Sequence, residues 1–505
     1  MSERLIPGTA ADIEKGMRLR PGQVGFGAVM FQSLTHIAPA LALIFALTVG
    51  VQYAGAALPL STLLGFIGIM AIAYSVGQLA RVLPAAGYYM TWTGRSIDPR
   101  YGFMAGWFVL MSEAIPMGGL FLILAATMDA FLPSYAHFNL HWIVWSLLIG
   151  AGVTVLLFLG VKVSGTAGVV LGLIELSIML ILAIWLIIAA GAHNTLSVFT
   201  PAAPGVQGGW VGVLRAVIYT VPTFAGFETA AVLAEESRDP KKNIPRAVVW
   251  ATFGTGIFFV LGAYAGVVAW GPSKIAGYAS SSNAWQVLGQ NVWGTAGAVL
   301  VFLALVNSIV GNTNAEATAS TRLMYAMGRI GALPRWFGRV HAQRRTPHHA
   351  IFFLMGLNFV IALIFGLVFG GPENGFGFAI SLGALFAILL YMSACLSVPF
   401  LYLRYVREEF HPIKHLLIPI IGILVFIGPL ISTVYPVPPY PLNLVPYIDL
   451  AWFIVGLGVM AYLLRRRPES VLNTQAIMLD AYTEDAEPLP ETPEGTAMPR
   501  RGATS

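Results

Sequence analysis

The sequence FQSLTHIAP, at residues 31–39, interrupts an apolar run that is otherwise long enough to cross a lipid bilayer. A membrane-spanning helix must satisfy its own backbone hydrogen bonds, so a break is tolerated only inside protein or beside a wet cavity. Pro39 lacks an N–H group, and its ring collides with the carbonyl group of Thr35, four residues earlier. We therefore expect a break here, with a carbonyl oxygen freed to face a ligand.

A second interruption lies in the apolar run at residues 210–235. Pro222 is followed there by the sequence FAGFE at residues 224–228. Glycine relaxes the backbone, and Glu228 places a carboxyl group deep in the apolar run, which is costly in lipid unless the group faces protein or water. We expect a break near residues 223–227.

The composition is that of an integral membrane protein. Of the 505 residues, 57% are hydrophobic and 10% are charged, and the mean hydropathy is +0.76. This chain is far more apolar than an average soluble domain. The predicted fold class is all-α, with twelve membrane-spanning helices at approximately residues 24–52, 58–80, 101–131, 142–160, 167–190, 210–235, 247–270, 294–326, 350–370, 376–403, 415–434 and 447–464.

The two interruptions fall in the first and sixth predicted spans, which are corresponding positions of two five-helix halves. That placement indicates an inverted repeat with a ligand site near the middle of the membrane. Half-helix N-termini attract a carboxylate, whereas half-helix C-termini and freed carbonyl groups attract an ammonium group. An amino acid zwitterion matches both ends. An ordinary proline kink remains the alternative explanation for either break taken alone.

Basic residues collect in every second connection between the spans, which predicts that these connections and both termini are cytoplasmic. The expected organisation is a cytoplasmic N-terminal segment at residues 1–23, a ten-helix transport core at 24–403, two further helices at 404–467 and a disordered cytoplasmic tail at 468–505. The tail is rich in Pro, Glu, Asp and Thr and cannot bury a core. We expect a multi-pass protein of a cell membrane.

Other classes of function are not expected. The net charge of +5 is spread over the connections as membrane orientation demands, so nucleic-acid binding is not predicted. The single cysteine, Cys395, permits neither an intrachain disulfide nor a cysteine-rich metal site. We expect no metal, no cofactor and no catalytic residues, because the sequence has no phosphate-binding loop, His-Glu-x-x-His pair or Gly-x-Ser-x-Gly motif.

Several segments resemble the amino acid/polyamine/organocation (APC) superfamily of permeases. FAGFE at 224–228, continued by EESRDPKKNIPRA at 235–247, resembles the sixth-helix break and the following cytoplasmic loop of that superfamily. Other matching segments are LPAAGYY at 83–89, GFMAGW at 102–107, LGVKVS at 159–164 and ASTRLMYAMGR at 319–329. The resemblance covers residues 25–350. It implies a five-plus-five inverted repeat, alternating access, and uptake or exchange of amino acids or amines.

We predict that the substrate binds where the first and sixth spans cross. The predicted substrate-binding residues are Ser33, Thr35, His36, Ile37, Glu113, Phe224, Ala225, Gly226 and Phe227. His36 changes charge near physiological pH, so it could sense protons or contact a carboxylate, although a buried histidine with satisfied hydrogen bonds is the alternative. Phe224 and Phe227 could close over the substrate as an aromatic lid, or they could simply pack.

Glu228 and Glu175 are the predicted proton-coupling residues. Glu228 matches a helix-six glutamate that, by resemblance, implies a proton-linked switch. A carboxyl group in a low dielectric favours its neutral form, so it can take up a proton on one side and release it when water reaches it. The alternative is a hydrogen-bonded glutamate that holds the broken helix in place. Glu175 lies near the position where many members of the superfamily carry a helix-five lysine.

Further acidic groups leave the nature of the cargo open. Glu113, Glu175 and Glu316 all lie in apolar spans, and any of them could bind a substrate amine. They suit a polyamine or a basic amino acid, but pairs with His36 or with buried hydroxyl groups explain them equally well.

The predicted function is secondary active transport of amino acids by alternating access, coupled to protons or to exchange. A transporter of polyamines or other organic amines is the alternative within the same fold, and a nutrient sensor that binds without transporting is the alternative class. The expected partners are a small amino acid or amine, protons and the lipid bilayer. The sequence leaves the oligomeric state open.

Overall fold

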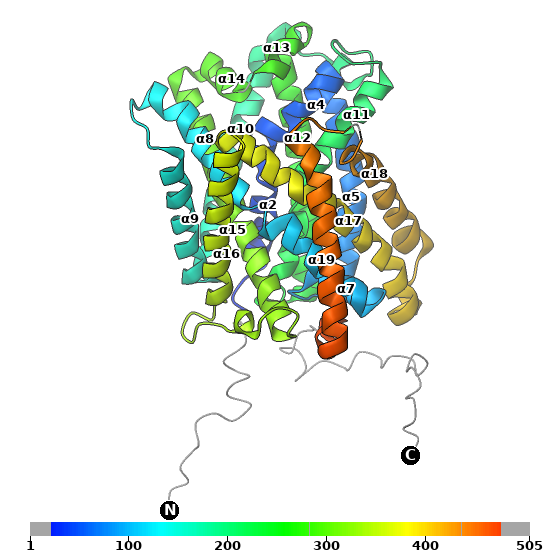
Figure 1. Cartoon of the computed structure of the whole chain (residues 1–505). Coiled ribbons are helices and arrows are strands. Elements are labelled where there is room, and N and C mark those ends of the chain that lie inside the picture. Colours follow the sequence, from blue (N-terminus) through cyan, green and yellow to red (C-terminus); the bar gives the residue numbers. More distant parts are fainter. Residues whose placement is uncertain (1–21, 282, 436, 476–505) are drawn as a thin grey trace, which may run out of the picture.

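The computed structural model describes residues 22–281, 283–435 and 437–475, which form a bundle of long helices (Figure 1). Eleven stretches of these residues are long and apolar enough to span a membrane. The first of them, Phe26–Val82, has 57 residues, which is more than twice the length that one crossing requires. We count it as two spans, so the described residues contain the twelve spans that the sequence predicts.

The spans are built from continuous or interrupted helices. In chain order they consist of α2 (Phe26–Ile37) with α3 (Pro39–Leu41) and α4 (Leu47–Ala54), α5 (Leu58–Val82), α7 (Pro99–Val109) with α8 (Gly118–Tyr135), α9 (Trp142–Leu159), α10 (Val161–Ala190), α11 (Trp210–Thr220) with the 3-10 helix η7 (Phe227–Leu233), α12 (Pro240–Trp270), α15 (Thr295–Arg329), α16 (His348–Val368), α17 (Pro372–Tyr405), α18 (Ile418–Ser432) and α19 (Val445–Arg466). Two π-helical turns, η1 (Ala42–Ala46) and η3 (Leu110–Ala114), lie inside the first and third spans.

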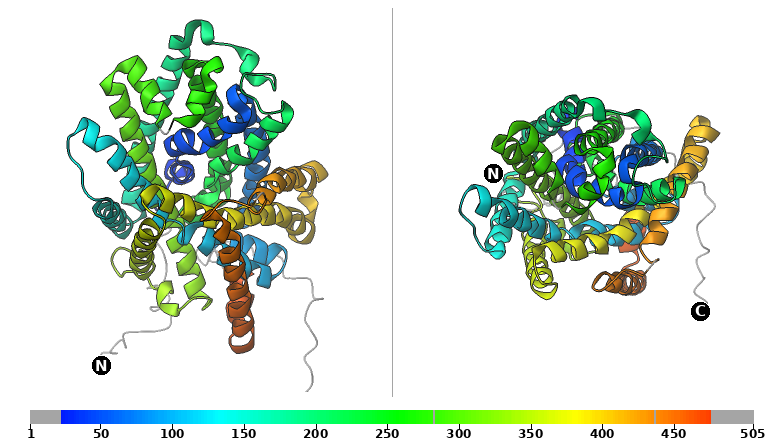
Figure 2. Two further views of the ribbon diagram at one scale, coloured as in Figure 1. Left: turned by 45° about the horizontal axis from the view of Figure 1, so that its top comes forward. Right: turned by 90° about the horizontal axis from the view of Figure 1, so that it is seen from above.

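Helix α2 lies in the interior of the bundle, where it packs against α10, α12 and α15. Helices α18 and α19 lie at the outer edge instead (Figure 2). Only 17% of the apolar 18-residue segment in the span of α19 is buried, whereas 67% of the corresponding segment in Phe26–Val82 is buried. Most of the surface of α19 is therefore available to lipid, whereas α2 is enclosed by other helices.

Short helices that the sequence analysis left in connections cover the ends of the bundle. Helix α6 (Tyr88–Ser96) packs against α7 and α17, and α14 (Ala284–Trp293) packs against α15. Together with α13 (Ile275–Ser280), α14 lies at the upper end in Figure 1. None of these segments has the continuous apolar run that marks a span, which is why periodicity and hydropathy do not reveal them.

The basic connections that the sequence predicts to share one side of the membrane contact one another. The guanidinium group of Arg404 donates a hydrogen bond to the carbonyl group of Ser96 at 2.9 Å. Arg81 forms an ion pair with Glu409, which joins the ends of the second and tenth spans. These contacts bring connections that are distant in sequence to the same end of the bundle.

The beginning of the predicted disordered tail is folded. Helix α20 (Glu469–Leu472) buries Val471, and the hydroxyl group of Thr474 donates a hydrogen bond to the carbonyl group of Pro99 at 2.9 Å. The structure therefore corrects the prediction of disorder for residues 468–475, because the buried side chain of Val471 and the hydrogen bond of Thr474 anchor a segment whose average composition is polar. The rest of the predicted tail and residues 1–21 of the N-terminal segment lie outside the described residues.

Candidate functional site

The first span is broken where the sequence predicts. Helix α2 ends at Ile37, and Ala38 turns the chain in the left-handed conformation, with φ 53° and ψ 68°. Pro39 then begins a second half-helix, in which its missing N–H group is tolerated because the first turn has no intrahelical acceptor for it. A carbonyl group at the break, that of His36, accepts a hydrogen bond from the side-chain amide of Asn312 at 2.5 Å.

The sixth span is broken within the predicted residues 223–227. Helix α11 ends at Thr220, Ala225 is extended, and Gly226 has φ 103° before η7 begins. A Cβ atom on Gly226 would lie 2.7 Å from Cγ of His36, so the two breaks touch at this point. Only a glycine leaves room for that contact and accepts the backbone conformation as well.

Ser33 connects the two broken spans directly. Its hydroxyl group donates a hydrogen bond to the carbonyl group of Phe227 at 2.5 Å and accepts one from the N–H group of Ala230 at 3.0 Å. Both bonds are made with backbone groups in the first turn of η7. The first and sixth spans are therefore held against each other at their breaks by a predicted substrate-site residue.

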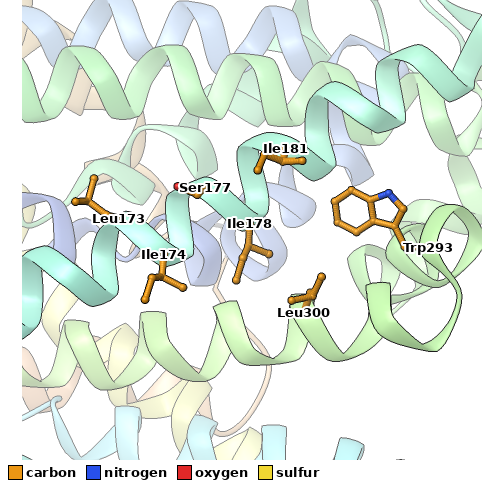
Figure 3. A pocket seen from close by; sticks show the side chains of 7 residues that line it. All are labelled: Leu173, Ile174, Ser177, Ile178, Ile181, Trp293 and Leu300. Carbon is orange, nitrogen blue, oxygen red and sulfur yellow. The ribbon is translucent and has the colours of Figure 1, made fainter.

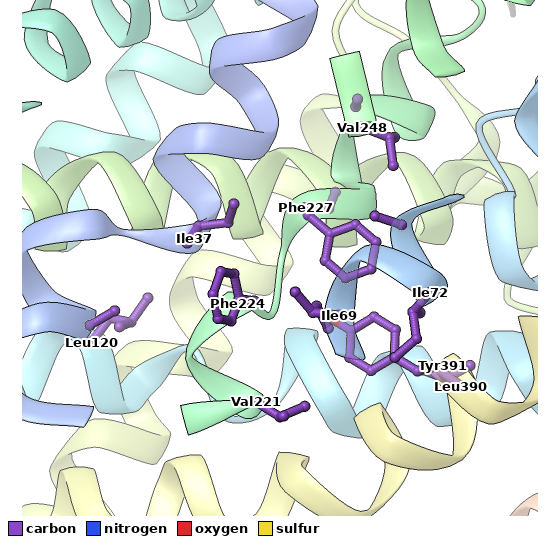
Figure 4. Close-up of a cluster of buried hydrophobic side chains, with 14 of the residues drawn as sticks. Ile37, Ile69, Ile72, Leu120, Val221, Phe224, Phe227, Val248, Leu390 and Tyr391 are labelled. Carbon is purple, nitrogen blue, oxygen red and sulfur yellow. The ribbon is translucent and has the colours of Figure 1, made fainter. Parts of the chain in front are cut away.

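Glu228 is fixed by a tyrosine of α17. The hydroxyl group of Tyr391 lies 3.1 Å from each carboxyl oxygen of Glu228 and accepts a hydrogen bond from the N–H group of Gly226 at 3.2 Å. The ring of Tyr391 stacks on that of Phe227, with centroids 5.4 Å apart, as Figure 4 shows. The tyrosine thus links the predicted coupling residue to the backbone of the break.

Glu113 lies within electrostatic reach of two other buried carboxyl groups. Glu113, on the π-turn η3, accepts a hydrogen bond from the hydroxyl group of Tyr88, which lies 2.9 Å from each of its oxygens. Glu113 interacts electrostatically with both Glu228 and Glu316 of α15. Within the described residues, none of the three forms an ion pair, and Glu316 makes no hydrogen bond.

Glu175 occupies a different place, at the start of the second half of the first span. One of its carboxyl oxygens accepts a hydrogen bond from the N–H group of Ala40 at 2.8 Å, and the other accepts one from the side-chain amide of Asn307 at 3.0 Å. The hydroxyl group of Ser308 accepts a hydrogen bond from the N–H group of Leu41 at 3.2 Å. These side chains cap the half-helix that begins at Pro39.

The remaining predicted residues differ in their surroundings. Thr35 donates a hydrogen bond to the carbonyl group of Phe31 in its own helix at 2.6 Å, and Ile37 lies in the apolar core. Phe224 is fully buried against aromatic rings of neighbouring helices, as is Phe227, so neither ring is exposed as a lid in this conformation. Ala225 is partly exposed.

Three side chains that hold the acidic groups are not among the residues predicted from the sequence. They are Tyr88, Asn307 and Tyr391, each a hydrogen-bond partner of a buried glutamate. A single polar group in an apolar span is a signal of interhelical hydrogen bonding. That signal marks Tyr391 and Asn307 as candidates, but the sequence does not show which glutamate each one reaches.

A shallow pocket of about 400 Å³ lies away from this site, between α10 and α15 (Figure 3). Its lining is almost wholly apolar and consists of Leu173, Ile174, Ser177, Ile178, Ile181, Trp293 and Leu300. Several of these side chains are half-exposed on the outer face of α10, where a bilayer would cover them with lipid. The pocket has no polar group suited to a charged substrate.

Comparison with known proteins places the chain in a family. A family model described as amino acid permease matches residues 26–460. The low-affinity putrescine importer PlaP of Escherichia coli (strain K12) is 26% identical over 380 residues, which are 75% of this chain and 81% of that protein. The histidine permease HisP of Lactococcus lactis subsp. cremoris (strain MG1363) is 26% identical over 57% of this chain and 61% of that permease.

The branched-chain amino acid permease BcaP of Bacillus subtilis (strain 168) is 25% identical over 374 residues, which are 69% of this chain and 75% of that permease. These relatives differ in the cargo for which they are named, and the family match covers both broken spans together with Glu113, Glu175, Glu228 and Glu316. The chain therefore belongs to the amino acid permease family.

Proposed function

We propose that this permease is a secondary active transporter that moves an amino acid or a related amine across a cell membrane by alternating access, coupled to protons or to exchange. The observation that supports this most strongly is the contact between two broken spans beside Glu113, Glu228 and Glu316. Broken spans place backbone ends and charged groups at the membrane centre, where continuous helices offer only apolar side chains.

Membrane orientation follows from the positions of the basic residues. Arg81, Arg329 and Arg404 lie in the last turns of α5, α15 and α17, at one end of the bundle. The described chain begins and ends at that same end, since Val24 contacts Glu236 and Thr474 contacts Pro99. The positive-inside rule assigns this end to the cytoplasm. We therefore propose that both termini are cytoplasmic.

Uptake by the purified protein in liposomes tests the proposed function. We expect saturable uptake of a radiolabelled amino acid or amine that is stimulated by unlabelled substrate inside the vesicles or by an inward proton gradient. Empty liposomes are the control. Saturable binding without flux under all of these conditions would instead indicate a sensor, and flux without saturation would indicate a channel.

A Glu228→Gln substitution tests proton coupling. The amide keeps a hydrogen-bond acceptor for Tyr391 but cannot carry a proton between the two sides. We expect the stimulation by a proton gradient to be lost, while exchange of labelled for unlabelled substrate without a gradient is retained. Tyr391→Phe removes the partner without removing the carboxyl group, so it should retain some stimulation. Normal gradient-driven uptake by Glu228→Gln would contradict this role of Glu228.

A further inference from the structure

The backbone donors at the first break are already satisfied by the protein itself. A half-helix that begins at Pro39 has few free N–H groups: Pro39 has none, and the N–H group of Ala42 donates to the carbonyl group of Ala38 at 2.9 Å. Only the N–H groups of Ala40 and Leu41 then need an acceptor. The N–H group of Ala40 donates to a carboxyl oxygen of Glu175, and that of Leu41 donates to the hydroxyl group of Ser308.

The capping group at this N-terminus is a carboxylate, the same chemical group that an amino acid would present. Glu175 is 2% exposed, and both of its oxygens accept hydrogen bonds, from Ala40 and from Asn307. The positive end of a helix dipole stabilises an anion, and the carboxyl group of Glu175 occupies that position. A second carboxylate arriving there would find the N–H groups of Ala40 and Leu41 already bonded.

Three backbone donors at the corresponding end of the sixth span also have protein partners. The N–H group of Gly226 donates to Tyr391, and that of Thr229 donates to the carbonyl group of Gly226 at 3.1 Å. The N–H group of Ala230 donates to Ser33. A substrate carboxylate would have to displace a protein partner at each of these backbone groups, and each displacement leaves a buried polar group unpaired.

The same region contains buried carboxyl groups that have no positively charged partner among the described residues. Glu113 interacts electrostatically with Glu228 and with Glu316, and none of the three has a basic partner among the described residues. Glu316 is more than nine-tenths buried and has no hydrogen bond within that part of the chain. It lies on α15, which packs against α2, η3 and η7. Buried carboxylates are stable when a cation joins them.

We propose that the preferred cargo is an organic amine without a free α-carboxylate, because Glu175 fills the place that the carboxylate of an amino acid would take and the three central glutamates bind the ammonium group. This inference rests on the proposed transport function and narrows its substrate class. A diamine fits best, since more than one carboxylate is available to it.

Matched pairs of substrates test the inference, because each pair differs only by the α-carboxylate. We expect purified protein in liposomes to take up putrescine in preference to ornithine, and cadaverine in preference to lysine, by at least about tenfold at low concentration. Preference for the amino acid in both pairs overturns the inference and leaves the proposed transport function intact. Saturable uptake of none of the four, nor of neutral amino acids, overturns the proposed function itself.

A Glu175→Gln substitution then tests the cause of the preference. The amide can still accept the hydrogen bond from Ala40, so the cap is kept while the negative charge is removed. We expect the ratio of putrescine to ornithine uptake to fall about tenfold, mainly through better uptake of ornithine. Glu373→Gln, in the exposed first turn of α17, is the matched control and should leave the ratio unchanged. An unchanged ratio in Glu175→Gln overturns the role assigned to Glu175.

Discussion

Replacing Gly226 with alanine is expected to abolish most transport and to lower the midpoint of thermal unfolding. The new methyl group would lie 2.7 Å from Cγ of His36 and 2.9 Å from its backbone carbonyl carbon. The φ angle of 103° adds roughly 1–2 kcal/mol of strain for an L-residue. Overpacking of an interior contact adds about 1–3 kcal/mol. The two breaks can no longer touch, so we expect uptake to fall about tenfold or more.

The measurement is uptake in liposomes together with thermal unfolding in detergent. Gly152→Ala is the matched control, because a Cβ atom at that position in α9 meets no other atom within 4 Å. This control should keep wild-type uptake and stability. If Gly226→Ala transported as well as Gly152→Ala, the close contact between the breaks would not be needed for transport.

Replacing Arg322 with methionine is expected to have the largest effect on stability. The guanidinium Nε of Arg322 lies 2.6 Å from a carboxyl oxygen of Glu236, and the two side chains are only 6% and 4% exposed. Removing one partner of a buried ion pair leaves an uncompensated charge, at a cost of roughly 3–5 kcal/mol. The pair also supports the junction where the N–H group of Val24 donates to the carbonyl group of Glu236.

A double substitution distinguishes loss of the pair from loss of packing. Arg322→Met combined with Glu236→Gln removes both charges, so most of the lost stability should return. Arg335→Met is the matched control, because Arg335 is exposed and should tolerate the same change. Equal unfolding midpoints for Arg322→Met and Arg335→Met would show that the buried pair does not stabilise the protein.

The spans and both breaks could be predicted from sequence because each depends on local chemistry. A continuous apolar run in a bilayer satisfies its backbone hydrogen bonds by forming a helix. A proline or glycine inside such a run disrupts the helix locally. The short helices α6, α14 and α20 were missed, because they are held by contacts with other helices rather than by their own apolar pattern.

Glu175 shows the limit of prediction within the site. Its position in an apolar span marks it as a residue that must face protein and makes it a predicted proton-coupling residue. Nothing in the local sequence shows that its carboxyl group reaches Ala40, which lies 135 residues away along the chain. The same holds for Tyr391, whose partner Glu228 is 163 residues distant.

The sequence by itself determined that this protein is a helical membrane protein of twelve spans, broken in the first and sixth, with acidic groups in its interior. Hydrophobicity, backbone hydrogen bonding and the cost of burying charge act on each segment alone, so they can be evaluated from the sequence. Only the tertiary structure decided which acidic group caps a half-helix and which are left without a basic partner. Those roles depend on which helices pack together, and helix packing is a property of the whole bundle.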